Sequence, residues 1–404
     1  MSLSKNYTGY TSFQYLEKEI DYPDFALASE INRVPEYLVP LNEPQEALVK
    51  NIVENHIMIS MHEHLGVFPA DVMQTPQYLR NGRMATGFEG LANSHWDAVF
   101  DNLMNGLCRI HSKSGWKWSE VLHDLGMRLC DIAHQDFVIH CKGVEDIKKA
   151  HREGKLAWIA TQEGAAMIEN ELDRLDILYG FGLRSLGITY SESNALGNGL
   201  KEKRDGGLTA FGHKAVERMN KLGILIDCSH TGDVTAMDTI ACSKKPIVLS
   251  HIGAQAIWNT NRMAPDDVLK ACADKGGVIG IEAAPHTTLS KANPSHSIAS
   301  VMDHFEYIKD LVGIDHVSFG PDTVYGDHVG LHHAYSSALS LKSSKSGKSS
   351  GMEYEEVPYV KGLENPTEAS KNIVRWLVKE GYSEQDIAKV IGGNVMRVLE
   401  EVWW

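Results

Sequence analysis

The stretches ILIDCSH, residues 224–230, and PIVLSH, residues 246–251, decide the fold of this chain. Each is a short apolar run that ends in serine and histidine. The amphipathic stretch TAFGHKAVERMNKLG precedes the first run and ends in glycine, as helices commonly do. Near-continuous apolar runs are typical of parallel strands covered by helices on both faces. The pattern predicts a βα unit that is repeated along the chain.

The same alternation runs from residue 56 to residue 322. Five more segments resemble strands, at 56–64, 156–164, 185–190, 277–283 and 316–322. An eighth strand is expected near HWDAVFDNLMNG, residues 95–106. Eight strands with helices between them favour an α/β fold, a (β/α)8 TIM barrel, over an open doubly wound sheet.

Two segments lie outside this alternation. Residues 1–54 lack a clear period and are expected to form an N-terminal extension that packs on the barrel made by residues 55–404. Residues 341–352, LKSSKSGKSSGM, are rich in serine, lysine and glycine, and this composition predicts a mobile loop.

Composition excludes several classes of protein. The net charge of −14 over 404 residues, without a basic stripe, argues against nucleic-acid binding. No run approaches 18 apolar residues and the N-terminal stretch does not resemble a signal peptide, so we expect a cytoplasmic protein that does not enter a membrane. The six cysteines include no CxxC pair, which indicates reduced thiols rather than disulfides or sulfur-ligated zinc.

Most predicted strands end in a side chain that can bind a metal. In a barrel, the catalytic groups gather at the carboxyl ends of the strands. Taken singly, each of these residues is more often a hydrogen-bonded structural residue, but five strands that deliver ligands to one rim together indicate a metal site. The candidates are His62, His64, Glu163, His230, His251 and Asp322. Because side chains alternate along a strand, His62 and His64 should point into the barrel and Glu63 away from it.

Imidazole and carboxylate ligands without thiolate fit zinc or a related divalent ion. Four histidines and one bridging carboxylate are enough for two ions. Such a pair lowers the pKa of a shared water and polarises a carbonyl group, so it indicates hydrolysis through a metal-bridging hydroxide. Asp322 is then the expected proton carrier.

Several motifs in chain order resemble the membrane (renal) dipeptidase family, peptidase family M19 of the amidohydrolase superfamily. They include EGKLAWIATQEGA, the DCSH and VLSHIGA segments, NRMAPDD and LVGIDHVSFGPD. The resemblance implies two zinc ions bridged by Glu163, with His62 and His64 on the first ion and His230 and His251 on the second.

The same resemblance implies roles in catalysis and substrate binding. Asp322 matches the catalytic aspartate of the family, and Arg262 matches the arginine that grips the substrate's terminal carboxylate. A surface ion pair is the alternative for Arg262. These roles predict hydrolysis of dipeptides or similar small N-acyl amino acids.

The chain departs from the family pattern at two positions. His64 stands where the family usually has an aspartate ligand, which makes the metal pair about one charge more positive. Tyr190 stands where the family has a histidine that hydrogen-bonds the scissile carbonyl; its hydroxyl could bind substrate and donate to the oxyanion. The alternatives are therefore a hydrolase of a non-peptide amide, ester or lactone, and a catalytically silent metal-binding member. Barrels of this size often form homodimers, so a homodimer is one expected assembly.

Overall fold

The computed structural model describes residues 5–103, 116–338 and 353–403. The loop predicted over residues 341–352 lies outside these residues. The described part contains one sheet in which all paired strands are parallel. Its strands are β1 (Ile59–Glu63), β2 (Ala98–Asn102), β3 (Val138–His140), β4 (Leu156–Gln162), β5 (Leu183–Gly187), β6 (Leu225–Asp227), β7 (Val248–Ile252), β8 (Val278–Ile281) and β9 (Val317–Phe319).

Eight of these strands form a nearly closed barrel in the order β1-β2-β4-β5-β6-β7-β8-β9. Two backbone hydrogen bonds connect its ends, from Asp322 N to the carbonyl of His62 and from His64 N to the carbonyl of Thr323, both 3.0 Å long. Gly320, directly after β9, lies close to β7, where a Cβ would be 2.1 Å from the carbonyl oxygen of Ser250, so this position requires glycine. The predicted (β/α)8 fold is confirmed, including its eighth strand within residues 95–106.

Strand β3 was not predicted. It pairs with the first half of β4, at Leu156 to Trp158, whereas β5 pairs with the second half, from Ala160 to Gln162. The short β3 therefore pairs with β4 ahead of the residues that pair with β5, and it is not one of the eight barrel strands.

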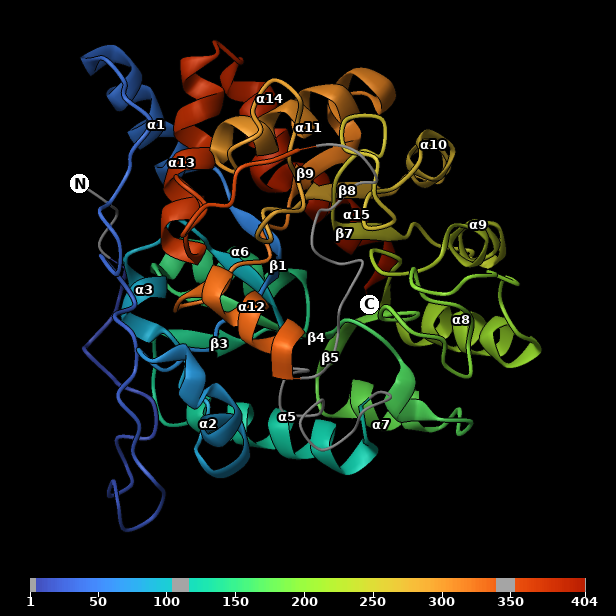
Figure 1. Cartoon of the computed structure of the whole chain (residues 1–404), viewed down its shortest axis with the longest axis horizontal. Helices are drawn as coiled ribbons and strands as arrows, with labels where there is room; N and C mark the ends of the chain where they lie inside the picture. The colour runs from blue at the N-terminus through green and yellow to red at the C-terminus, as the bar shows by residue number, and fades with distance from the viewer. Residues whose placement is uncertain (1–4, 104–115, 339–352, 404) are drawn as a thin grey trace.

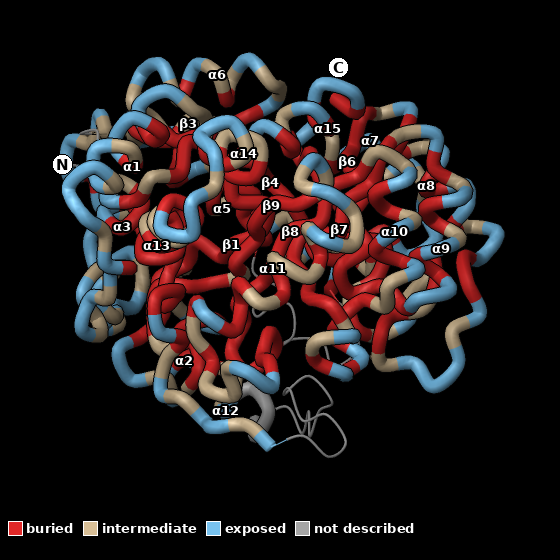
Figure 2. The backbone as a smooth tube through the Cα atoms, turned by 90° about the horizontal axis from the view of Figure 1, so that it is seen from above, coloured by how far each residue is buried: buried red, intermediate tan, exposed pale blue. Residues whose placement is uncertain are grey.

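Helices surround the sheet, and the buried part of the chain gathers along the strands (Figures 1 and 2). None of the described helices is long and apolar enough to cross a membrane. The α-helices are α1 (Glu43–Asn55), α2 (Thr75–Asn81), α3 (Phe88–Ala92), α5 (Trp118–Ile132), α6 (Val144–Glu153), α7 (Arg174–Gly180), α8 (Ala210–Leu222), α9 (Asp233–Cys242), α10 (Asp266–Asp274), α11 (Ile298–Val312), α12 (His328–Ala338), α13 (Pro366–Lys379), α14 (Glu384–Ala388) and α15 (Asn394–Val402).

Residues before α1 lie against the barrel without regular structure (Figure 1). Tyr10 and Phe13 are buried there. The carboxylate of Asp131, at the end of α5, accepts hydrogen bonds from the Tyr10 hydroxyl at 2.7 Å, the Ser12 hydroxyl at 2.6 Å and the backbone N–H of Phe13 at 3.0 Å. One buried carboxylate thus fastens this segment to the helical layer.

Helix α15 covers the amino ends of the strands. Its apolar side and Trp403 belong to one buried cluster with the first residues of several strands, among them Ile59, Ala98, Val248 and Val278. The opposite end of the barrel, where the strands finish, is left for the candidate site.

Trp403 is expected to stabilise this end of the barrel. Its ring lies 6.2 Å from that of Phe100, and its indole N–H donates to the carbonyl of Arg184 at 3.3 Å. Replacing Trp403 with alanine should lower the free energy of unfolding by about 3 to 5 kcal/mol, because it leaves a cavity in a packed core. Urea unfolding would measure this, with alanine at the exposed Ile177 as the control. A loss below about 0.5 kcal/mol would contradict the role, since that is the range of surface substitutions.

Candidate metal centre

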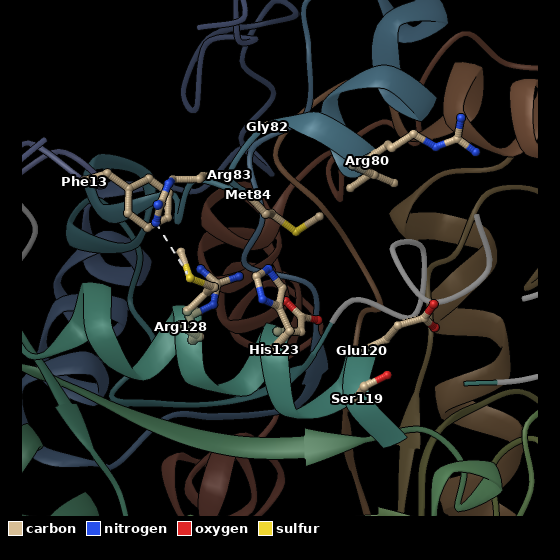
Figure 3. Close-up of a pocket in the computed structure, with 12 residues that line it drawn as sticks. Phe13, Arg80, Gly82, Arg83, Met84, Ser119, Glu120, His123 and Arg128 are labelled. Atoms are coloured by element: carbon tan, nitrogen blue, oxygen red, sulfur yellow. Dashed lines mark hydrogen bonds between the residues drawn. The ribbon is translucent and has the colours of Figure 1, made fainter. Parts of the chain in front are cut away.

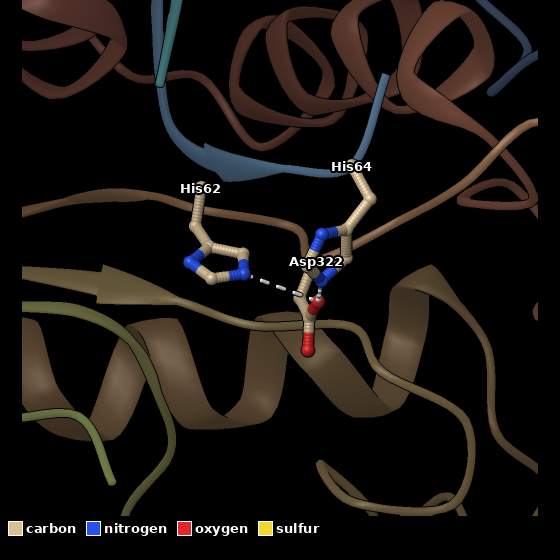
Figure 4. Close-up of side chains that lie close together, drawn as sticks. All are labelled: His62, His64 and Asp322. Carbon is tan, nitrogen blue, oxygen red and sulfur yellow. Dashed lines mark ion pairs between the residues drawn. The ribbon is translucent and has the colours of Figure 1, made fainter. Parts of the chain in front are cut away.

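Two histidines, His62 in β1 and His64 directly after it, have rings that turn toward one carboxylate, and we call them the β1 histidines (Figure 4). The pairing of β1 with β2 is irregular between Ser60 and Glu63, so Met61 and His62 share one partner. A β-bulge of this kind re-aims side chains at the rim of a barrel. It allows Met61 to join the apolar cluster inside the sheet while His62 and the following His64 reach the site.

Asp322 comes from the loop after β9 and lies next to both β1 histidines. Its Oδ1 is 3.3 Å from Nε2 of His62 and 3.2 Å from Nε2 of His64. The Asp322 backbone has a φ of 55°, a left-handed conformation that aspartate tolerates better than most residues. The hydrogen bonds that connect β1 with the loop after β9 hold this turn in place.

Glu163, directly after β4, joins the β1 histidines to a second histidine pair. Its Oε1 is 3.4 Å from Nε2 of His64, and its Oε2 is 3.2 Å from Nε2 of His230. The Nε2 atoms of His230 and His251 are 2.9 Å apart. The two oxygens of Glu163 thus face one histidine from each pair.

Neighbours on the far side of the rings orient three of the four imidazoles. The side-chain amide of Asn102 lies 2.6 Å from Nδ1 of His62, and its backbone carbonyl lies 2.9 Å from Nδ1 of His64. The hydroxyl of Ser250 lies 2.8 Å from Nδ1 of His251. At His64 and His251 the oxygen beside Nδ1 leaves Nε2 to face the site, which is the usual arrangement around metal-binding histidines.

Charge in this buried site is strongly coupled. Burial alone would raise the pKa of Glu163, but His230, His62 and His64 outweigh it and lower that pKa to about 2. Burial alone would lower the pKa of His64, but Asp322 and Glu163 raise it to about 10. The Glu163 carboxylate therefore stays ionised and is stabilised by positive charge, which protonated histidines or metal ions can supply.

The described residues contain three groups of potential ligands whose donor atoms lie within 4.8 Å of one another. Their oxygen and imidazole donors, without thiolate, fit zinc or a similar divalent ion. The groups are His62, His64 and Asp322; His62, Glu163 and His251; and His251, Glu282 and Asp322.

Tyr190, three residues after β5, lies beside the second histidine pair. Its ring centre is 4.4 Å from that of His230 and 5.5 Å from that of Trp116. Tyr190, one of the two residues that depart from the family pattern, is thus next to the proposed ligand His230.

Arg262 is buried rather than on the surface. Its guanidinium donates to the carbonyls of Ser229, at 3.2 Å, and His251, at 3.0 Å, and forms an ion pair with Glu282. Its position is adjacent to the candidate ligand His251, and its guanidinium binds groups of the protein itself.

Three residues near the site have roles that the sequence did not reveal. Asn102 and Glu282 both stand at strand ends, so their positions carried the same signal as the predicted ligands. Glu63 points away from the histidines, as expected, but its buried carboxylate accepts hydrogen bonds from the backbone N–H of Thr323 at 2.8 Å and the Thr323 hydroxyl at 2.7 Å. It supports the turn that carries Asp322.

A separate pocket of about 280 Å³ lies between the N-terminal segment, the loop after α2, and α5 (Figure 3). Phe13, Arg83, His123 and Arg128 are among its lining residues, and the predicted site residues are not. Its Arg128 is already paired, with Nε 3.3 Å from the carboxylate of Asp101. The pocket is not part of the candidate metal centre.

With the fold and this site described, the chain can be compared with known proteins. The family model for membrane dipeptidase, peptidase family M19, matches residues 47–337 and 350–403. The chain belongs to the membrane dipeptidase family. The match spans most of the barrel and includes every predicted ligand of this M19 member.

Individual relatives are distant. The dipeptidase aclJ of Aspergillus oryzae is 27% identical over 293 residues, which cover 70% of this chain and 62% of that protein. Dipeptidase 3 of Rattus norvegicus is 27% identical over 258 residues, 61% of this chain and 45% of that protein. The M19 member described above therefore matches less than two thirds of either curated relative.

A solved structure shares the fold. An amidohydrolase from Pseudomonas aeruginosa superimposes with a TM-score of 0.70 at 24% identity, covering 88% of this chain and 99% of that chain. The similarity supports the barrel architecture of this M19 member.

Proposed function

We propose that the protein is a metal-dependent hydrolase that cleaves the amide bond of dipeptides or similar small N-acyl amino acids. The observation that carries the proposal is the carboxylate of Glu163, whose two oxygens face His64 and His230. Membership in the dipeptidase family supports it.

The residues that would hold two ions are His62, His64, Glu163, His230 and His251. When bound there, two divalent ions, with zinc as the first choice, would acidify a water molecule and polarise the scissile carbonyl.

Asp322 is the proposed proton carrier. Burial alone would raise its pKa, but His62, His64 and His251 hold that pKa well below the usual range, so the carboxylate is ionised at neutral pH. It would take a proton from the attacking water and return it to the leaving nitrogen. The Tyr190 hydroxyl would donate a hydrogen bond to the developing oxyanion.

A library of dipeptides incubated with the purified protein, with and without added zinc, tests the proposal. Release of free amino acids that depends on metal would support it. If the metal-loaded protein cleaves no member of the library, the proposed dipeptide substrate is refuted.

Replacing Tyr190 with phenylalanine is expected to lower kcat by about 10²-fold, the usual cost of losing one oxyanion donor. KM should change little, because the donor acts mainly in the transition state. Steady-state kinetics would measure both constants. Phenylalanine at Tyr382, whose hydroxyl contacts Glu306 on the outer helices, is the matched control. An unchanged kcat in the Tyr190 variant would remove tyrosine from the mechanism.

A second candidate keeps the site and changes the substrate to a non-peptide amide, ester or lactone. Tyr190 favours it, because a phenol replaces the family's histidine beside His230. The substitution Tyr190→His distinguishes the two candidates. If dipeptide hydrolysis appears only in that variant, the natural substrate lies in the second class.

A further inference from the structure

Glu282 lies at the metal centre but was not among the ligands predicted from the strand ends. It follows β8 directly, and its side chain is fully buried. Its backbone N–H donates to the carbonyl of Ile252 at 3.1 Å, and its own carbonyl accepts from the Thr288 hydroxyl at 2.9 Å. Donor atoms of His251, Glu282 and Asp322 lie within 4.8 Å of one another. Glu282 therefore faces the space in which a substrate would meet Asp322.

The guanidinium of Arg262 is engaged by groups of the protein. One terminal nitrogen donates to both Glu282 and the carbonyl of His251, and the other donates to the carbonyl of Ser229. These acceptors belong to the ends of β6, β7 and β8. A guanidinium suits a carboxylate, and here the carboxylate is supplied by the protein.

A carboxylate on the substrate would compete with Glu282 for this guanidinium. Displacing Glu282 would leave a buried carboxylate without its cation, which is costly. Binding beside it would place two anions together, with Asp322 a third negative group nearby. A neutral group at the same place meets neither penalty.

We infer that Glu282 is a specificity-determining residue that makes Arg262 an internal anchor and selects substrates that carry no carboxylate at the leaving-group end. The inference rests on the proposed amide hydrolysis and revises its preferred substrate. The scissile bond stays the same, but the leaving amino acid carries an amide or ester, so dipeptide amides and esters are preferred over free dipeptides and N-acyl amino acids.

Matched pairs of dipeptides and their C-terminal amides test the inference, because the two share the same scissile bond. The wild type is expected to favour the amide in kcat/KM. The variant Glu282→Gln keeps the size of the side chain and removes its charge. In this variant the ratio of kcat/KM for the amide to kcat/KM for the free dipeptide should fall by about 10- to 100-fold. Most of the change should be in KM, as like-charge repulsion predicts. An unchanged ratio in Glu282→Gln, or a wild type that prefers the free dipeptide, would overturn the inference.

Three controls separate this role from a structural one. Glu282→Asp keeps the charge and should keep the preference for the amide. Glu364→Gln removes another buried partner of an arginine, Arg33, away from the site, and should leave the ratio unchanged. If the wild type cleaves neither compound, the hydrolase proposal fails. Calorimetry can then measure the affinity of the wild type and of Glu282→Gln for the same two compounds. The role of Glu282 still requires that the wild type binds the amide more tightly than the free dipeptide and that the variant loses this preference.

Discussion

Replacing Asp322 with asparagine is expected to lower kcat by about 10²- to 10⁴-fold, the range attributed to a general acid–base residue. The amide has the same shape but cannot accept the proton from water or return it to the leaving nitrogen. KM should change much less than kcat, because the proton moves only in the reaction step. Steady-state kinetics of wild type and variant across pH would measure this, with the acidic limb of the kcat profile lost in the variant.

Asp315→Asn is the matched control for this prediction. Asp315 precedes β9 and lies at the other end of the strand, where its carboxylate is 2.7 Å from Nζ of Lys389. Its kcat should equal that of the wild type. The role of Asp322 would be refuted if its asparagine variant kept its metal ions and lost less than about threefold in kcat.

Removing the metal ions with a chelator should abolish hydrolysis, with at least a 10³-fold loss that added zinc restores. It should also lower the thermal midpoint. Five buried ligand side chains converge there, and ions that bind only the folded chain stabilise it by about 2.7 kcal/mol at a free concentration 100 times Kd. Elemental analysis and a thermal scan of the same sample would measure metal content and stability.

His230→Ala is expected to reduce the metal content from two ions to about one per chain, because it removes a ligand of the second ion. The exposed His213 on α8 provides the matched alanine control, whose metal content should not change. Full activity after complete metal removal would contradict the proposed chemistry. Equal metal content in the His230 and His213 variants would contradict the ligand set.

The barrel could be predicted from the chain because its strands are long apolar runs separated by amphipathic segments. A strand such as Leu156–Gln162 is buried along its whole length, and its first five residues are all apolar, as burial on both faces of a sheet favours. Strand β3, Val138–His140, has three residues and owes its conformation to pairing with β4. Strands β6 and β9 are equally short but belong to the repeated βα pattern, whereas β3 lies outside the barrel path and its structure depends on pairing with β4.

The sequence by itself determined the barrel and which end of it bears the site. The carboxyl ends of parallel strands must meet at one rim, and His62, Glu163, His230 and His251 all occur there. Only the tertiary structure decided that Asn102 supports both β1 histidines and that Glu282, twenty residues from Arg262, takes up its guanidinium. Strand position is encoded in local hydrophobicity, whereas the pairing of buried polar groups depends on three-dimensional distance, which no local pattern contains.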